Sequence, residues 1–384
     1  MGKRTVLVSG AGIAGSTLAY WLARNGFAVT VVERAGDLRS SGNPVDVRGP
    51  AAQVAERMGV LPQLLAARTR ATALTFVDAR GRRVGRIDMA AIQRAAGAPD
   101  IELGRGDLAR ILLAAGQDEA EFRSGDGIAD LRQDGGGVDV EFDRGGRGRY
   151  DLVIGADGLH SAVRRLAFGP ERDLVQYAGM YVGGVQLAGP APDPSDVVMF
   201  NTPGRAVAVH PGSGRALVAF MFRRPEVADF DYRDAGQHRK LLAEAFADGG
   251  WRVPELLAHV EAAPEFYFDA VSQVDLPSWT RGRVALVGDA ASCLSLFGDG
   301  STLAIAGAAT LAEELAADPD HTAALRRFEA RHRELVEPKL RNMGGASQLL
   351  VPSTGWGIAV RNLLTRTWPL AAAAVRLNRA LRRS

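Results

Sequence analysis

Three glycines near the start of the chain have a spacing that suits one kind of chemistry, the binding of a phosphate group by backbone amides. They are Gly10, Gly12 and Gly15, in the pattern G-x-G-x-x-G. Gly10 permits a tight turn, and Gly12 lets backbone N–H groups approach a pyrophosphate at the positive end of a helix. Gly15 lets that helix pack against the preceding strand. Ile13 and Ala14 lie inside the same turn, so all five residues are predicted to contact a dinucleotide.

An acidic residue, Glu33, follows the glycine turn by about 20 residues, the distance used in dinucleotide sites. Its carboxylate is expected to accept hydrogen bonds from the adenosine ribose hydroxyls. The glycine motif and its acid do not separate FAD from NAD, because both cofactors carry the ADP group.

The elements that must position these residues are visible on either side of them. Residues 5–9 form an apolar, β-branched run that is typical of a buried parallel strand. A helical pattern with Leu18 and Leu22 follows and ends at Asn25-Gly26, which suits a helix C-cap. Residues 27–32 predict a second strand that leads into the acid. This order indicates a Rossmann-type nucleotide site.

Two later motifs repeat the arrangement of a strand followed by a polar turn. The first is the pair Asp157 and Gly158, which follows an apolar run at residues 152–154. The second is the pair Gly288 and Asp289, which also ends an apolar run. Each places a carboxylate at the carboxyl end of a predicted strand, the edge where ligands of open α/β sheets bind.

The three motifs, in this order, resemble those of the p-hydroxybenzoate hydroxylase-like family of FAD-dependent aromatic hydroxylases. The resemblance covers nearly the whole chain, and residues 266–291 look similar to members that modify polyketides and other secondary metabolites. It implies an α/β fold with a Rossmann-type FAD-binding domain of the glutathione reductase-like kind, an inserted mixed β-sheet substrate domain and C-terminal helices. The implied division is 1–72 plus 98–175 plus 272–335 for the FAD domain, 73–97 plus 176–271 for the substrate domain, and 336–384 for the C-terminal helical segment.

The resemblance also implies roles for matching residues. Asp289 would bind a ribityl hydroxyl of FAD, and Asp157 would lie at the pyrophosphate, where it serves both FAD and NAD(P)H. Arg105 would reach the diphosphate, Arg34 would lie along the adenine, and Arg48 would lie where the chain passes the flavin ring. Each arginine could instead form an ordinary ion pair. The start of a later small-residue helix would also contact the cofactor, through Gly298, Gly300 and Ser301.

The middle of the chain predicts a sheet that would roof the flavin and line the substrate cavity. Strand-like alternation occurs at residues 181–187, 197–200, 206–211 and 216–223. The expected cavity residues are Tyr181, Met199, His210, Phe220 and Phe222. The competing interpretation is that the aromatic side chains are ordinary core. His210 could deprotonate a phenol, because a histidine has an ordinary pKa of about 6.5, although a half-exposed strand histidine is the commoner case.

The implied reaction is a monooxygenation. NAD(P)H would reduce the flavin, O2 would form a flavin hydroperoxide, and one oxygen atom would pass to a small aromatic or polyketide-like molecule by hydroxylation or epoxidation. The protein would position the substrate and exclude water. The sequence has no second Rossmann motif, and the resemblance implies that NAD(P)H docks transiently instead.

One loop departs from the family pattern. Family members carry a proline before the G-x-G that follows the G-D pair, whereas Leu296 stands here and Asp299 occupies the middle of Gly298-Asp-Gly300. A carboxylate beside a ring that becomes anionic should make reduction harder, unless Asp299 points away or is protonated. The loop either still supports oxygenation or leaves FAD as a structural floor for a non-redox reaction such as a cyclisation. A simple dehydrogenase is a further alternative.

The composition excludes several other classes. The 384 residues carry a net charge of +2, which does not favour a nucleic-acid partner. The single cysteine, Cys293, fits a reducing cytoplasm, and no His/Cys cluster has metal-ligand spacing. No apolar run approaches the roughly 20 residues of a membrane span. The C-terminal arginines are interleaved with Leu and Ala, which predicts an amphipathic terminal helix docked on the protein, with a helix on a membrane surface as the alternative.

Overall fold

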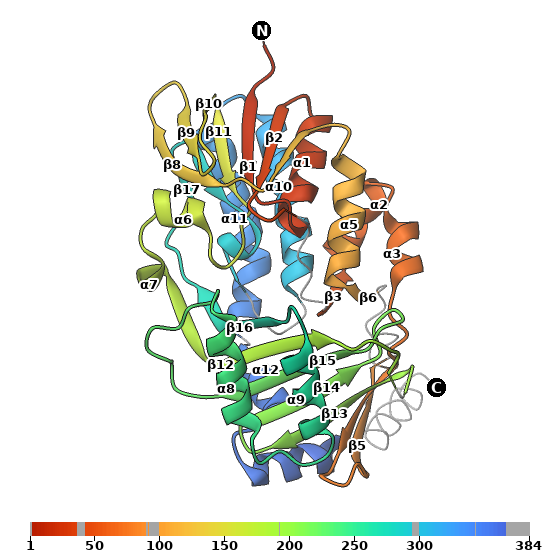
Figure 1. The fold of residues 1–384 in the computed structure, drawn as a ribbon. Helices are drawn as coiled ribbons and strands as arrows, with labels where there is room; N and C mark the ends of the chain where they lie inside the picture. Colours follow the sequence, from red (N-terminus) through yellow and green to blue (C-terminus); the bar gives the residue numbers. More distant parts are fainter. Residues whose placement is uncertain are drawn as a thin grey trace, which may run out of the picture.

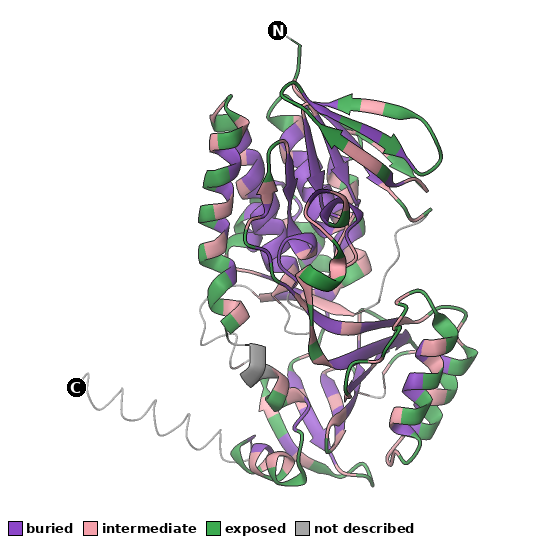
Figure 2. Cartoon of the chain, turned by 90° about the vertical axis from the view of Figure 1, so that its left-hand side faces the viewer, coloured by how far each residue is buried: buried purple, intermediate pink, exposed green. Residues whose placement is uncertain are grey.

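A computed structural model gives the fold, and it describes residues 2–36, 43–89, 91, 100–191, 193–293, 299–341 and 343–365. The chain forms two halves, one built around the N-terminal strands and one around a broad sheet (Figure 1). Buried residues are concentrated in the centre of each half, and the outer helices expose one side (Figure 2). The predicted α/β class, with a Rossmann-type domain, an inserted mixed sheet and C-terminal helices, is confirmed.

The first half is built on a six-stranded sheet, in the order β17-β18-β11-β1-β2-β7. Its neighbours pair in parallel except for β17 with β18. Val6, Leu7 and Val8 of the central strand are fully buried, as expected of a parallel strand covered on both faces. The strands are β1 (Thr5–Ser9), β2 (Ala28–Glu33), β7 (Glu121–Ser124), β11 (Leu152–Gly155), β17 (Thr280–Arg281) and β18 (Val284–Leu286).

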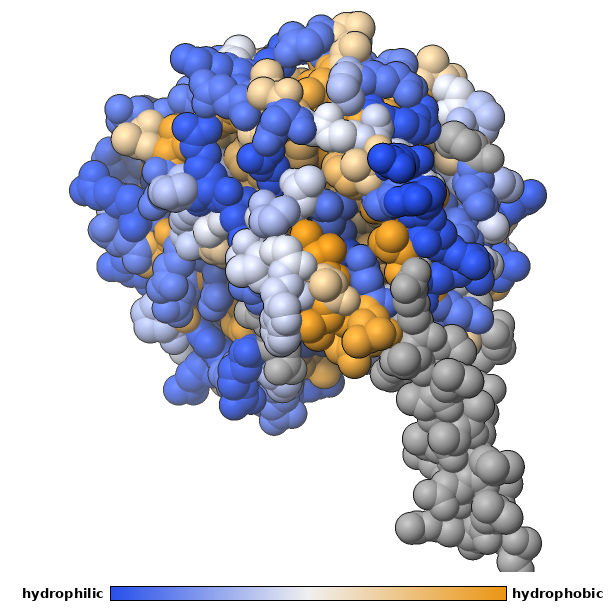
Figure 3. Space-filling view, turned by 90° about the horizontal axis from the view of Figure 1, so that it is seen from below, coloured by the Kyte–Doolittle hydropathy of each residue, from blue (hydrophilic) through white to orange (hydrophobic). Residues whose placement is uncertain are grey.

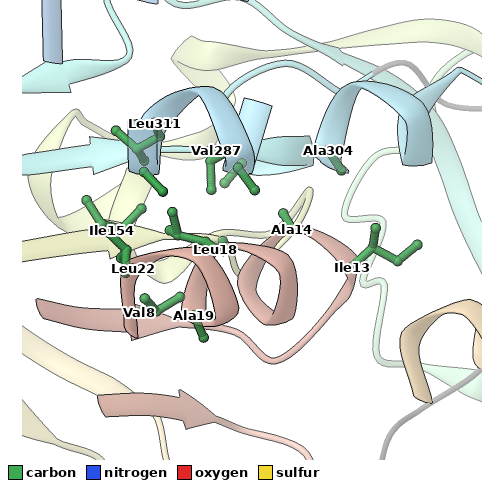
Figure 4. Close-up of a cluster of buried hydrophobic side chains, with 14 of the residues drawn as sticks. Val8, Ile13, Ala14, Leu18, Ala19, Leu22, Ile154, Val287, Ala304 and Leu311 are labelled. Carbon is green, nitrogen blue, oxygen red and sulfur yellow. The ribbon is translucent and has the colours of Figure 1, made fainter. Parts of the chain in front are cut away.

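The helices of this half cover the sheet and form its core. Helix α10 contains mostly small residues and packs closely on α1, where Leu18 and Leu22 meet Ile154, Val287 and Leu311 (Figure 4). The helices are α1 (Ile13–Arg24), α2 (Pro50–Arg57), α3 (Leu61–Ala67), α5 (Arg105–Gly116), α6 (Ala162–Ala167), α7 (Glu171–Leu174), α10 (Gly300–Ala317) and α11 (His321–Arg341), with the 3-10 turn η1 (Gly288–Ala290).

Two small antiparallel sheets complete the first half. One is the three-stranded meander β10-β9-β8, and the other is a two-stranded ribbon of β3 and β6 that lies between the two halves. The strands are β3 (Pro44–Arg48), β6 (Asp100–Gly104), β8 (Ile128–Gln133), β9 (Val138–Phe142) and β10 (Arg147–Tyr150).

The second half is a seven-stranded mixed sheet in the order β16-β12-β15-β14-β13-β4-β5. Within the described residues, β13 and β4 pair in parallel and the other neighbouring strands of this sheet pair antiparallel. Helices α8 (Ala235–Phe246) and α9 (Val253–Ala262) pack on one face, here called the helix face. The strands are β4 (Ala73–Val77), β5 (Arg83–Asp88), β12 (Val175–Gln186), β13 (Asp196–Thr202), β14 (Arg205–His210), β15 (Leu217–Arg223) and β16 (Tyr267–Val274).

The opposite face of this sheet, here called the inner face, is partly covered by the C-terminal segment. At the end of α12 (Met343–Leu350), the carbonyls of Leu350 and Val351 accept hydrogen bonds from Asn201 and Arg223. Arg361 is buried and stacks on Phe76, with 3.8 Å from its guanidinium carbon to the ring centroid. The predicted terminal helix beyond residue 365 lies outside the described residues.

The surface seen from below is mostly hydrophilic, with one gathered apolar area (Figure 3). Large apolar side chains that are exposed near the end of the described chain include Leu349 and Trp356. No helix in the described part of the chain has the length and apolar character needed to cross a bilayer.

Candidate active site

The glycine turn at the end of β1 is fixed by close backbone approaches. Gly10 has φ +102°, and a Cβ there would lie 2.5 Å from the carbonyl oxygen of Ala156. A Cβ on Gly15 would lie 1.8 Å from the carbonyl oxygen of Gly10. Gly12 differs, because it is the N-cap of α1 and nothing lies within 4 Å of a Cβ there. Open space therefore remains at the positive end of α1, where the first amides, including those of Ile13 and Ala14, lack helical acceptors.

Glu33 lies at the end of the neighbouring strand, β2, and binds the glycine turn. Its carboxylate accepts hydrogen bonds from the N–H groups of Ala11 at 2.8 Å and Ala35 at 2.9 Å. An ionised carboxylate has about four acceptor positions, so two remain for ribose hydroxyls. Glu33 also lines a cavity of about 120 Å³ with Gln117 and Ser124. The geometry therefore suits the adenosine end of a dinucleotide.

Asp157 lies beside the glycine turn, and its carboxylate accepts hydrogen bonds from groups of the protein itself. A Cβ on Gly10 would lie 3.0 Å from the Asp157 Cα. The carboxylate accepts hydrogen bonds from the hydroxyl of Ser161 and from the N–H groups of Ala162 and Val163 at the start of α6. Burial raises the pKa of Asp157, and these hydrogen bonds act against the rise. The side chain thus fixes the turn next to the phosphate position.

The G-D turn packs directly against the glycine turn. A Cβ on Gly288 would lie 2.8 Å from the Cβ of Ala14, so the two turns are in contact. Asp289 follows in η1, and its Oδ2 lies 3.6 Å from Nη2 of Arg105. The structure therefore brings together two residues that the sequence predicted separately for the middle of FAD.

Arg164 joins the two later motifs, and sequence reasoning gave it no role. Its guanidinium is fully buried and donates hydrogen bonds to the carbonyls of Leu159 and, at 3.2 Å, Ala290. These carbonyls belong to the D-G turn and the G-D turn. Arg164 follows Asp157 closely in the sequence, but neither its burial nor its partners were visible there.

The ribbon carries a charged face between the two halves. Asp46 and Arg48 on β3 pair with Glu102 and Asp100 on β6, and Val47 points into the core on the other side. Arg48 contacts Asp46 at 2.8 Å and Asp100 at 2.6 Å. Burial raises the pKa of Asp46 to about 7, opposed by Arg48 and assisted by neighbouring carboxylates.

The first turn of α10 holds this ribbon in place. The hydroxyls of Ser301 and Thr302 donate to the carbonyl of Asp46 at 2.6 and 2.9 Å, and the N–H of Arg48 donates to Thr302 at 3.1 Å. Arg48 and Ser301 are thus brought together with Gly300, the first residue of the helix. Gly298 lies outside the described residues.

His210 has a hydrogen-bond partner at each ring nitrogen. The N–H of Gly212 donates to Nδ1 at 2.9 Å, and Nε2 lies 2.9 Å from the carboxylate of Glu102. The proton of a neutral ring is therefore on Nε2, where it is donated to Glu102, and neither nitrogen is free for a substrate. His210 therefore ties the sheet to the ribbon, and its role as a base stays a prediction that these hydrogen bonds do not favour.

The predicted cavity residues divide between the two faces of the large sheet. Tyr181, Phe220 and Phe222 lie on the helix face, where they are buried against α8 and α9. Their assignment to the cavity is wrong, because successive residues on a strand point to opposite faces and the aromatic positions follow the helix core. Met199 lies on the inner face, in a cluster with Met180 and Met221.

The inner face is the side that meets the ribbon. His210 lies on this face and contacts Glu102, and a Cβ on Gly184 would lie 2.9 Å from the side-chain oxygen of Asn43, next to β3. The paired residues Gly184, Ala219 and Ala208 form one row across it. Small and aliphatic side chains therefore face the cofactor-binding half.

A second cleft lies where the D-G turn meets the second half. It has a volume of about 350 Å³ and is lined by Arg34, His160, Arg165, Glu171, Tyr232 and Arg233. Arg34 lies here, 3.6 Å from Asp143, and does not line the Glu33 cavity, so its adenine role stays a prediction.

His160 links the two sides of this cleft and was missed at the sequence level. Its ring stacks on Tyr232 with centroids 3.6 Å apart, and its nitrogens contact Glu171 at 2.9 Å and Asp269 at 3.2 Å. Burial lowers the pKa of His160, but the hydrogen bonds and charges of Asp269 and Glu171 outweigh it and raise the value to about 9. A cation therefore sits in the cleft at neutral pH.

Comparison with known proteins agrees with this geometry. The family described as FAD binding domain matches residues 3–336. An uncharacterised protein of Mycobacterium tuberculosis is 40% identical over 345 residues, covering 87% of this chain and 91% of that protein. A flavin-dependent monooxygenase of Legionella longbeachae is 34% identical over 336 residues, covering 86% of each. The crystal structure of the tetracycline destructase Tet(51) has a TM-score of 0.82 at 33% identity, covering 94% of this chain and 95% of that one.

The glycine cradle, the open N-terminus of α1 and the carboxylate of Glu33 fit the ADP part of FAD, and the facing pair Asp289 and Arg105 continues the same path. The predicted family and cofactor are confirmed. The chain belongs to the p-hydroxybenzoate hydroxylase-like family of FAD-dependent monooxygenases.

Proposed function

We propose that this monooxygenase uses NAD(P)H and O2 to hydroxylate or epoxidise an aromatic or polyketide-like small molecule in secondary metabolism. The observation that carries the proposal is the chemistry of the inner face. Its row of Gly184, Ala219 and Ala208 is small and apolar, which is the lining expected of a pocket for a flat ring system. The tetracycline destructase with 33% identity is a relative whose name points to a substrate of this class.

The residues of the chain would divide the work along the cofactor. The glycine turn and Glu33 bind the ADP end, and Asp289 and Arg105 bind the middle of the molecule. FAD, when it is bound, supplies electron transfer from nicotinamide to O2. The inner face excludes water and orients the substrate above the ribbon, where Arg48 and Asp46 offer polar contacts.

The second cleft is our proposed docking site for the reduced nicotinamide nucleotide. Arg34, Arg165 and Arg233 supply cationic groups for its phosphates. The cleft contains no glycine-rich turn, which agrees with transient rather than resident binding. Arg165→Ala should raise the KM for the nucleotide by about tenfold while FAD content stays unchanged.

The domain division and the cofactor contacts remain part of the proposal. The large sheet lies within residues 73–88 and 175–274, which supports a substrate domain at 73–97 and 176–271. Met199 lies on the inner face, so it stays a candidate residue of the substrate cavity.

The test is anaerobic reduction followed by product analysis. Purified yellow protein is mixed with NADPH or NADH, and the visible flavin band is followed with and without tetracycline, a polycyclic phenol or a small pyridine carboxylate. Bleaching that is faster with the polycyclic ligands, and a product that has gained one oxygen atom in air, would support the proposal. A flavin that dithionite reduces but neither nucleotide reduces, with any ligand, would contradict it and favour a non-redox role.

A further inference from the structure

The carboxylate of Asp299 does not stand alone beside the cofactor path. Asp299 is the N-cap residue of α10, and its Oδ2 lies 2.7 Å from Nζ of Lys339 on α11. The two side chains are 24% and 36% exposed, so water screens the pair only partly. The sequence suggested that Asp299 must point away or hold a proton, whereas the structure supplies a cation.

A continuous series of contacts leads from the ADP end of the site to this pair. The G-D turn touches Ala14 of the glycine turn, and Asp289 faces Arg105. The N–H of Arg105 donates to the carbonyl of Asn43 at 3.0 Å, directly before β3. Asp46 on β3 is bonded in turn to Ser301 in the first turn of α10. The ring of a FAD molecule bound at Glu33 and Asp289 would therefore lie near the ribbon and the start of α10.

The charge of Asp299 acts on ionisable groups of the ribbon. It is one of the carboxylates that raise the pKa of Asp46, after burial, Glu102 and Asp100, and it also acts on Arg48. A charge with influence at the ribbon would also act on a flavin ring bound beside the ribbon and the first turn of α10.

We propose that Lys339 is a positioning residue that neutralises Asp299 and so keeps reduction of the bound flavin favourable in this enzyme. The inference rests on the proposed redox function. Hydride transfer from NAD(P)H to FAD moves two electrons and one proton and leaves NAD(P)+ and the reduced ring FADH−. The ring gains one negative charge, which an uncompensated Asp299 would oppose.

The experiment measures the midpoint potential of the bound flavin by anaerobic equilibration with a dye of known potential. Lys339→Met should lower the ratio of reduced to oxidised flavin at fixed potential by about tenfold, which is about 30 mV for a two-electron couple. Asp299→Asn with Lys339→Met should return the ratio to the wild-type value, and Lys339→Arg should preserve it. The difference between Lys339→Met and wild type should shrink at high salt.

The matched control is Lys240→Met, which removes the same charge from the exposed surface of α8 on the second half. It should leave the potential unchanged. Circular dichroism and the FAD content of each variant report whether the fold persists. Equal potentials for wild type and Lys339→Met would overturn the proposal, as would a double variant that remains as low as Lys339→Met.

The dye measurement requires neither nucleotide nor substrate, so it separates the two proposals. A potential that responds as expected in a protein that NAD(P)H cannot reduce would sink the proposed function and leave the charge compensation standing. Reduction by NAD(P)H with no response to Lys339→Met would do the reverse.

Discussion

The glycine turn and the large sheet differ in what fixes the identity of their residues. In the turn, the surrounding backbone atoms require glycine, because a Cβ on Gly15 would lie 1.8 Å from a carbonyl oxygen. In the sheet, the alternation of apolar residues along a strand shows only that successive side chains point to opposite faces. Phe220 and Phe222 share one face and Met221 lies between them on the other. A sequence can therefore specify a turn by itself, whereas the meaning of a sheet face depends on what packs against it.

The largest expected effect separates two glycines of the same turn. Gly15→Ala places its Cβ against backbone that cannot give way, so we expect loss of soluble, folded protein. Gly12→Ala meets nothing within 4 Å and keeps an ordinary φ of −71°, so the fold should persist. Its methyl group would occupy the pyrophosphate position and weaken FAD binding by at least about tenfold. Circular dichroism and FAD content measure the two effects, and a yellow, folded Gly15→Ala protein would refute the steric argument.

The same difference explains how much the sequence could predict. The motifs around Gly12, Asp157 and Asp289 led to the fold, the family and the cofactor, because short-range backbone demands leave a local signature. His160 and Arg164 were missed as functional residues, since their importance comes from burial and from partners more than 100 residues away, such as Asp269 and Ala290. The face assignment failed because α8 and α9 follow later in the chain, and alternation alone does not say which face they cover.

Two neighbours on β15 can sharpen the comparison within the sheet. Phe222→Ala removes a fully buried ring from the helix face and should lower the free energy of unfolding by about 3–5 kcal/mol. Met221→Leu on the inner face should cost less than about 1.5 kcal/mol, because the volume is nearly conserved. Chemical denaturation gives both values. Substrate KM should change in the Met221 variant, and a change confined to Phe222 variants would reverse our assignment of the faces.

A buried histidine makes the nucleotide-binding half sensitive to acid. His332 on α11 stacks on Phe328, and neither of its ring nitrogens has a hydrogen-bond partner within the described residues. Burial lowers its pKa from 6.5 to about 4, so between these values only the unfolded chain takes up the proton. Stability should fall as pH drops through this window, by up to about 3 kcal/mol. His332→Phe should flatten this part of the pH profile in denaturation experiments; an unchanged slope would exclude His332 as its cause.

The junction of the two halves should respond to pH in the opposite direction. The raised pKa of His160, about 9, means that the folded state holds a proton that the unfolded chain releases near 6.5. This contribution is complete below pH 6.5 and is lost as the pH rises through 9, by no more than about 3 kcal/mol. Denaturation of His160→Gln between pH 6 and 10 checks it, with the wild-type chain as reference. If both proteins lose stability in parallel, another group is responsible.

The smallest expected effect belongs to His210, where the two regions meet. Glutamine can still donate a hydrogen bond to Glu102, so His210→Gln should cost only about 1 kcal/mol of stability. His210→Leu leaves the buried carboxylate of Glu102 with Thr69 as its remaining neutral donor and should cost more, roughly 2–3 kcal/mol. A histidine that served as the base would produce a different pattern: kcat would fall in both variants, and its pH profile would lose a limb. We expect the pH profile of kcat to keep its shape in His210→Gln, because both ring nitrogens are committed to Gly212 and Glu102 and the residue joins the sheet to the ribbon.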